Sequence, residues 1–153
     1  MKSCKDMDDN NQRKFSRVKI QGAVRLAFSS KQYSGVLDNL SLCGAFVKGT
    51  FKQSTGDICI INFKEAVFES EIAVRVIGSV AWNNDSGIAI DFIAMRTESY
   101  HWLETELLTQ AVDPSTLEDE ILQQNFFKLD EDLVYNSTFS YNKNKLKKLL
   151  DLP

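Results

Sequence analysis

The chain of 153 residues contains only two prolines and one histidine, and the first proline is Pro114. Its three cysteines, Cys4, Cys43 and Cys59, form an odd set without metal-ligand spacing, so neither a disulfide framework nor a zinc site is predicted. No apolar run approaches the roughly 18 residues that a membrane-spanning helix needs. The polar N-terminal segment lacks the apolar stretch of a secretory signal. We therefore expect a reduced, cytoplasmic protein without membrane insertion.

Charge of one sign is also scarce, because the formal net charge is only −3. A balance this close to neutral argues against binding to nucleic acid polymers. The sum hides a division: residues 1–97 hold 13 Lys or Arg against 10 Asp or Glu, whereas residues 98–153 hold 5 against 11. With 43% hydrophobic residues, the chain is long enough to bury a core in one globular domain. A mildly basic body followed by an acidic tail is the expected organisation.

The residue patterns of common enzymes are missing. The sequence has no G-x-S-x-G, no P-loop and no H-E-x-x-H motif. The single histidine, His101, falls in a helical pattern, where a structural or solvent-facing role is the usual one. We predict that the protein is not an enzyme, with no catalytic residues, no metal site and no cofactor.

Alternating apolar residues dominate the first two thirds of the chain. Even positions from Val18 to Phe28 are apolar, which is typical of a half-buried strand. The same reasoning predicts strands over 33–40, 42–47, 58–63, 68–82 and 88–92, with a turn at 83–87 between the last two. Several short strands separated by turns predict a mainly β protein, a small antiparallel barrel or sandwich.

Helical spacing replaces the alternation after about residue 96. Thr97 is expected to cap a helix that carries Tyr100, Leu103 and Leu107 on one side. Asp113 and the following proline predict the start of a second helix, which would extend to Phe126. Residues 128–142 show no regular pattern, and 144–152 predict a short basic and apolar helix.

Two short motifs carry chemistry suited to a ligand. Arg13 and Arg17 form R-x-x-x-R, and guanidinium groups can bind phosphate oxygens bidentately or stack on bases. Asn39, Ser41 and Gly44 form N-x-S-x-x-G, whose short polar side chains can hydrogen-bond a guanine edge. Each motif also has a plain structural interpretation, as ordinary surface arginines and as a turn with a glycine bulge.

Taken in order, the two motifs resemble those of the PilZ domain family of bacterial cyclic di-GMP receptors. Val80-Ala81-Trp82 and the stretch Gly87–Phe92 resemble later motifs of that family, and the resemblance covers residues 12 to about 110. It implies a six-stranded antiparallel PilZ-type β-barrel, with a helix after the last strand and a C-terminal helical extension. The implied division is a flexible leader over 1–12, a PilZ-like domain over 13–110 and an acidic, partly helical extension over 111–153.

The resemblance also implies a ligand, cyclic di-GMP, and the residues that hold it. Arg13 and Arg17 would contact its phosphates and guanine bases. Asn39 and Ser41 would recognise guanine, and Gly44 would permit a close fit.

Three further positions are secondary candidates for the same ligand site. Gln12 stands where many members have another arginine, which favours binding of one ligand molecule over a pair. Asp38 precedes the second motif. Trp82 matches a barrel tryptophan that can lie near the ligand, although a purely structural aromatic is the alternative.

By this resemblance the protein is a receptor or adaptor that changes conformation on binding cyclic di-GMP. It would relay the signal to an unidentified downstream protein, in processes such as motility or biofilm formation. The alternative is a PilZ-like interaction module that works without the ligand. The extension over 111–153 either pads the barrel or forms the output surface, and a homodimer is a further option.

Overall fold

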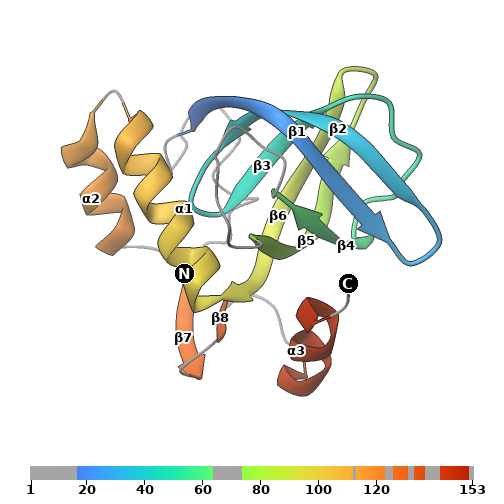
Figure 1. The fold of residues 1–153 in the computed structure, drawn as a ribbon. Helices are drawn as coiled ribbons and strands as arrows, with labels where there is room; N and C mark the ends of the chain where they lie inside the picture. Colours follow the sequence, from blue (N-terminus) through green and yellow to red (C-terminus); the bar gives the residue numbers. More distant parts are fainter. Residues whose placement is uncertain are drawn as a thin grey trace.

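The computed structural model describes residues 17–63, 74–111, 113–122, 126–130, 133–136 and 142–151. Its strands and helices follow one another along the chain as shown in Figure 1: β1 (Val18–Phe28), β2 (Gln32–Leu40), β3 (Gly44–Lys48), β4 (Ile58–Asn62), β5 (Arg75–Asn83), β6 (Gly87–Arg96), α1 (Thr97–Gln110), α2 (Pro114–Leu122), β7 (Phe126–Asp130), β8 (Leu133–Asn136) and α3 (Lys143–Asp151).

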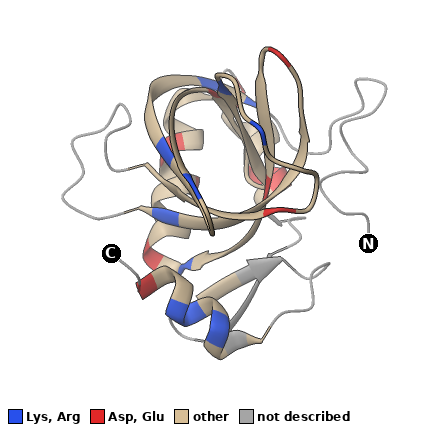
Figure 2. Cartoon of the chain, turned by 90° about the vertical axis from the view of Figure 1, so that its right-hand side faces the viewer, with Lys and Arg blue, Asp and Glu red and all other residues tan. Residues whose placement is uncertain are grey.

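Strands β1 to β6 form a closed antiparallel barrel. Their order is β3-β2-β1-β4-β5-β6, and pairing of β3 with β6 closes the ring. The closed ring is visible in Figure 2. This confirms the six-stranded barrel, with a helix after its last strand, that the sequence predicts. Closure pairs the strand edges that an open sheet would expose.

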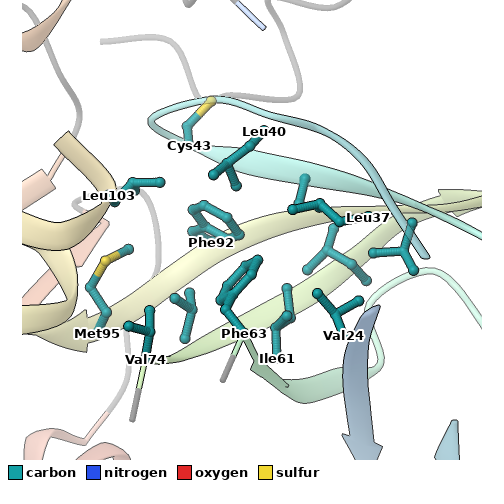
Figure 3. Close-up of a cluster of buried hydrophobic side chains, with 14 of the residues drawn as sticks. Val24, Leu37, Leu40, Cys43, Ile61, Phe63, Val74, Phe92, Met95 and Leu103 are labelled. Carbon is teal, nitrogen blue, oxygen red and sulfur yellow. The ribbon is translucent and has the colours of Figure 1, made fainter. Parts of the chain in front are cut away.

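The barrel core follows from the alternation in the sequence. The even-numbered apolar residues of β1 point inward, and Leu26 and Val24 are at most 1% exposed. Figure 3 shows Phe92 of β6 near the middle of the buried cluster, with Leu103 of α1 on one side of it. Burying one such large side chain contributes about 1.5–3 kcal/mol. Helix α1 therefore closes one end of the barrel with its apolar side.

The pairing of β5 with β6 contains two register shifts, the first with its extra residue, Ile93, in β6 and the second with its extra residue, Ala81, in β5. They occur between Ile77 and Gly78 and between Val80 and Trp82 in its pairing with β6. A bulge places two residues opposite one and so moves the following side chain to the other face. Val80 is fully buried, whereas Trp82, which shares its even numbering, is 41% exposed. The tryptophan is thus a barrel-surface residue.

The C-terminal tail contains strands where the sequence predicts none. Residues 128–142 were expected to be irregular and Phe126 was expected to belong to the second helix. Instead β7 and β8 form an antiparallel hairpin, and β8 pairs with β6 through Ala94, Met95 and Arg96. The hairpin extends the barrel sheet, so the tail is only partly helical and is joined to the barrel by backbone hydrogen bonds.

Helix α3 packs against the outside of the barrel. Leu146 and Leu150, spaced four apart, are 2% and 4% exposed and join a second apolar cluster with Ile77 and Ile93. The Arg75 side chain donates to the Leu150 carbonyl, and Arg96 pairs with Asp151. The predicted short basic and apolar helix is confirmed, and its apolar side covers barrel residues that would otherwise face water.

The helix starts differ in one detail from expectation. The first helix begins at Thr97, but Arg96 holds the cap position and no side chain caps it, so Thr97 is not the cap. Asp113 does cap α2, because its carboxylate accepts from the backbone N–H and the hydroxyl of Thr116.

Within the described residues, no helix is long and apolar enough to cross a membrane.

The cysteines are not all equivalent. Cys59 is a buried free thiol, and burial raises its pKa to about 12. Cys43 is buried in the β2–β3 connection, where its backbone N–H donates to the Ser41 hydroxyl at 3.3 Å.

Candidate functional site

The two sequence motifs meet at the start of β1. The Arg17 guanidinium donates to the Asn39 side-chain carbonyl at 3.3 Å, although 22 residues separate them. Antiparallel pairing of β1 with β2 causes this, since Lys19 lies opposite Asn39. Arg17 comes from the first motif and Asn39 from the second, so the structure brings these two predicted site residues together.

Asp38 is the most buried charge near this junction, at 8% exposed. Its carboxylate accepts from Lys19 at 3.3 Å and from the Asn39 amide at 3.2 Å, and it pairs with Lys48 at 3.2 Å. Burial opposes ionisation of Asp38, but these hydrogen bonds outweigh it and hold the pKa of the carboxyl below its ordinary value. Asp38 therefore stays charged at neutral pH and fixes the Asn39 amide.

Ser41 shapes the connection between β2 and β3. Its hydroxyl donates to the Gly44 carbonyl at 3.3 Å and accepts from the Cys43 N–H, also at 3.3 Å. Its own backbone N–H donates to the Gly44 carbonyl at 2.9 Å. Ser41 is 5% exposed, so its first role in this structure is to hold the turn.

Gly44 is the first residue of β3 and lies opposite Asp91 of β6. A Cβ atom built at this position would lie 2.6 Å from the carbonyl oxygen of Ile90. No side chain fits at that distance without movement of the backbone. The neighbouring Phe92 N–H donates to the Cys43 carbonyl at 2.8 Å, which draws the turn against the barrel. The glycine is thus required for packing of the motif against β6.

Two aromatic side chains lie on the outer surface beyond Asn39. Strand pairing places Asn39 opposite Phe46, Phe46 opposite Ala89, and Ala89 opposite Trp82. The ring centroids of Phe46 and Trp82 are 5.5 Å apart. Three strand spacings of about 4.8 Å separate the backbones of Asn39 and Trp82, or roughly 14 Å along the curved wall of the barrel. Trp82 thus belongs to the same cross-strand row, with Phe46 as the aromatic nearest to Asn39.

Other predicted residues are not placed by the structure. Arg13, Gln12 and the leader over 1–12 lie outside the described residues. Among the residues that are described, no group of three or more His, Cys, Asp or Glu side chains could hold a metal ion.

Three residues of this region were not singled out from the sequence. Lys19 and Lys48 hold Asp38, and Phe46 stands beside Asn39. Phe46 could have been found, because it is an apolar residue between the inward-pointing Ala45 and Val47 and must therefore face outward. The lysines could not, since their approach to Asp38 depends on the registers of three strands.

The closed six-stranded antiparallel barrel followed by a helix defines a class of small β-barrel domain. Within that class, the sequence profile of the PilZ domain matches residues 11–108. The chain belongs to the PilZ domain family.

Solved structures share the fold. The PilZ domain of CeSA from a cellulose-synthesizing bacterium is 17% identical, with a TM-score of 0.52, over 61% of this chain and 96% of that one. The Bacillus subtilis inhibitor of motility MotI/DgrA is 11% identical, also with a TM-score of 0.52, over 67% of this chain and 55% of that one. No curated protein sequence matches the chain. These identities establish a common fold only.

Proposed function

We propose that this protein is a receptor for cyclic di-GMP that binds the dinucleotide at the Arg17–Asn39 junction. The observation that carries the proposal is the 3.3 Å hydrogen bond that joins one motif to the other. This bond brings residues 22 positions apart in sequence within contact of each other, which supports a single site there. Membership of the PilZ family, whose domains are generally cyclic di-GMP receptors, supports the choice of ligand.

The chemistry of the junction suits a planar, doubly anionic ligand. The Arg17 guanidinium is a fork that can bind phosphate oxygens or stack on a guanine, and Arg13 would act beside it. Asn39 offers an amide whose orientation Asp38 fixes at 3.2 Å. Ser41 and Gly44 would shape the adjoining wall, and Phe46 and Trp82 would supply apolar surface for the far base.

The same proposal assigns the parts of the chain. Residues 1–12 would be a leader, 13–110 the receptor domain and 111–153 the extension that relays binding to a downstream protein by population shift. Domains of this family are typically non-enzymatic, and we propose the same here, with neither cofactor nor catalytic residues. Motility and biofilm formation are the candidate processes, and a homodimer is a candidate assembly.

Isothermal titration calorimetry with cyclic di-GMP tests the ligand. The full chain should bind, and Arg17→Ala should weaken binding by about 1–3 kcal/mol, or roughly tenfold to a hundredfold. Arg25→Ala is the matched control, because Arg25 is exposed on the same strand but lies outside both motifs. The Arg25→Ala variant should bind cyclic di-GMP with the affinity of the wild type.

Two results would count against the proposal in different ways. No heat with the wild type at tens of micromolar ligand would remove cyclic di-GMP and leave the alternative, an interaction module that works without it. Equal weakening by both arginine variants would show that the effect is general charge and not the junction.

We also propose a cytoplasmic location. The buried free thiol of Cys59 supports this location, because reduced cysteines are typical of the cytoplasm. Labelling of thiols in protein that is unfolded directly on lysis of the cells tests it: labelling of Cys43 and Cys59 is expected, and an unlabelled Cys43 would contradict the proposal.

A further inference from the structure

A pocket of about 500 Å³ lies between the start of β1 and the corner that joins α1 to α2. One wall is the start of β1, with Arg17, Val18 and Lys19. The other wall comes from the end of α1 and the start of α2, with Gln110, Ala111, Asp113 and Thr116. In Figure 1 the start of β1 lies near these two helices. The pocket therefore joins the predicted ligand site to the C-terminal extension.

Strand pairing explains why the pocket forms there. Strand β4 pairs only with the second half of β1, from Arg25 to Phe28. The first half of β1 has β2 on one side, and helix α1 contacts the strand from elsewhere. Arg17 borders the pocket and donates to Asn39, so one residue belongs both to the junction and to the pocket.

The two walls differ in chemistry. The β1 wall carries the cations of Arg17 and Lys19, which suit a phosphate. The helical wall carries an acceptor, because hydrogen bonds from Thr116 hold the pKa of the Asp113 carboxyl below its ordinary value. Each carboxylate oxygen of Asp113 accepts one bond from Thr116, at 3.3 Å and 2.6 Å, and keeps a lone pair. Gln110 adds an amide to the same wall.

A guanine base fits this combination. Its Watson–Crick edge presents an N1–H and an exocyclic N2 amino group, two donors side by side that a carboxylate accepts together. We propose that one guanine base of the dinucleotide enters this pocket. The Asp113 carboxylate would accept hydrogen bonds from the Watson–Crick edge of that base, and the adjoining phosphate of the dinucleotide would contact Arg17. The inference rests on the proposed function and extends the binding site beyond the family domain into α2.

The consequence is a direct link between ligand and extension. Asp113 caps α2, so a base bound to Asp113 contacts the first turn of that helix. Ligand binding would then hold the α1–α2 corner against β1. A conformational change inside the barrel is then not required for the ligand to act on the C-terminal extension.

Asp113→Asn tests this contact in the full chain. Asparagine is as good a helix cap as aspartate, so α2 keeps its start, but an amide replaces one of the two acceptors. Asp119→Asn is the matched control, because Asp119 is exposed on α2 and does not line the pocket. Both variants should show the wild-type circular dichroism spectrum.

Calorimetry uses two probes, cyclic di-GMP and cyclic di-IMP, which lacks the exocyclic amino groups. Asp113→Asn should lower the affinity for cyclic di-GMP roughly tenfold. The ratio of the affinity for cyclic di-GMP to that for cyclic di-IMP should fall by a similar factor. Asp119→Asn should change neither value.

The outcomes separate the two proposals. If the wild type binds cyclic di-GMP, Arg17→Ala weakens it, and the two aspartate variants behave alike, the pocket inference is wrong while the proposed function stands. If Asp113→Asn weakens both probes equally, the carboxylate does not read the guanine amino group and the inference is also wrong. Failure of the wild type to bind overturns both.

Discussion

The outer surface of the barrel has two faces of different chemistry. At the start of β1 and the end of β2 it carries Arg17, Asp38 and Asn39 in a hydrogen-bonded group. Around β5 and β6 it carries Ile77 and Ile93, which α3 covers. In α3, Lys145 and Lys148 are exposed, and the blue of the basic residues marks much of this helix in Figure 2. The polar face of the barrel is thus the one proposed to bind a ligand, whereas the apolar face is covered by helix α3 of the same chain.

The C-terminal extension therefore contacts the barrel in two different ways. Helix α3 is held by apolar packing that needs no ligand, whereas the α1–α2 corner meets β1 across a pocket of about 500 Å³. Substitutions on the apolar face should therefore change stability without changing ligand affinity. Substitutions on the polar face should do more to affinity than to stability.

Leu146→Ala should give the largest loss of stability. Leu146 is 2% exposed under α3, and truncation of a buried leucine costs about 2–4 kcal/mol. Urea unfolding measures the loss, and calorimetry should show unchanged affinity for cyclic di-GMP. Lys148→Ala, on the exposed side of the same helix, is the control and should cost less than about 0.5 kcal/mol. A parallel loss of ligand affinity in Leu146→Ala would mean that the two faces are coupled.

Gly44→Ala should affect both properties, because the site packs there against β6. The added Cβ would meet the Ile90 carbonyl at 2.6 Å, and relieving such a clash costs about 1–3 kcal/mol. Thermal unfolding should show the loss, and titration should show weaker ligand binding as the turn shifts. Unchanged unfolding and affinity together would show that the turn yields without strain.

Asp38→Asn should give the smallest effect and the only one of the three that depends on pH. The pKa of Asp38 is lower in the folded state, so its ion pairs stabilise the fold above the unfolded-state value and are lost as the pH falls through the folded-state value. With exposed lysine partners, the cost at pH 7 should be about 1 kcal/mol or less. Unfolding in urea at pH 7 and pH 3 measures it. If the difference in unfolding free energy between the wild type and the variant were the same at pH 7 and pH 3, this role of Asp38 would be contradicted.

The barrel was predictable because its information is local. Alternation from Val18 to Phe28 indicates both a strand and its buried side. The hairpin of β7 and β8 was missed because its strands have five and four residues, too few to show a period, and because its partner β6 is distant in sequence. The even numbering of Val80 and Trp82 puts both on one face, and the bulge between them, which separates their faces, leaves no mark in apolar spacing.

The candidate site was predictable in composition but not in geometry. The motifs supplied Arg17 and Asn39, and the structure confirms that they meet. The ion pairs of Asp38 with Lys19 and Lys48 required strand registers, and the pocket beside Asp113 required the position of α2. Neither follows from residue order alone.

Strand β6 adjoins both faces. One edge pairs with β5 along most of its length, and the other pairs with β3 over residues 87–91 and with β8 over 94–96. Nine of its ten residues are buried. Such a strand has no position where a side chain can be exchanged without disturbing a neighbour. Substitutions in β6 should therefore be tolerated less well than substitutions in the elements around it.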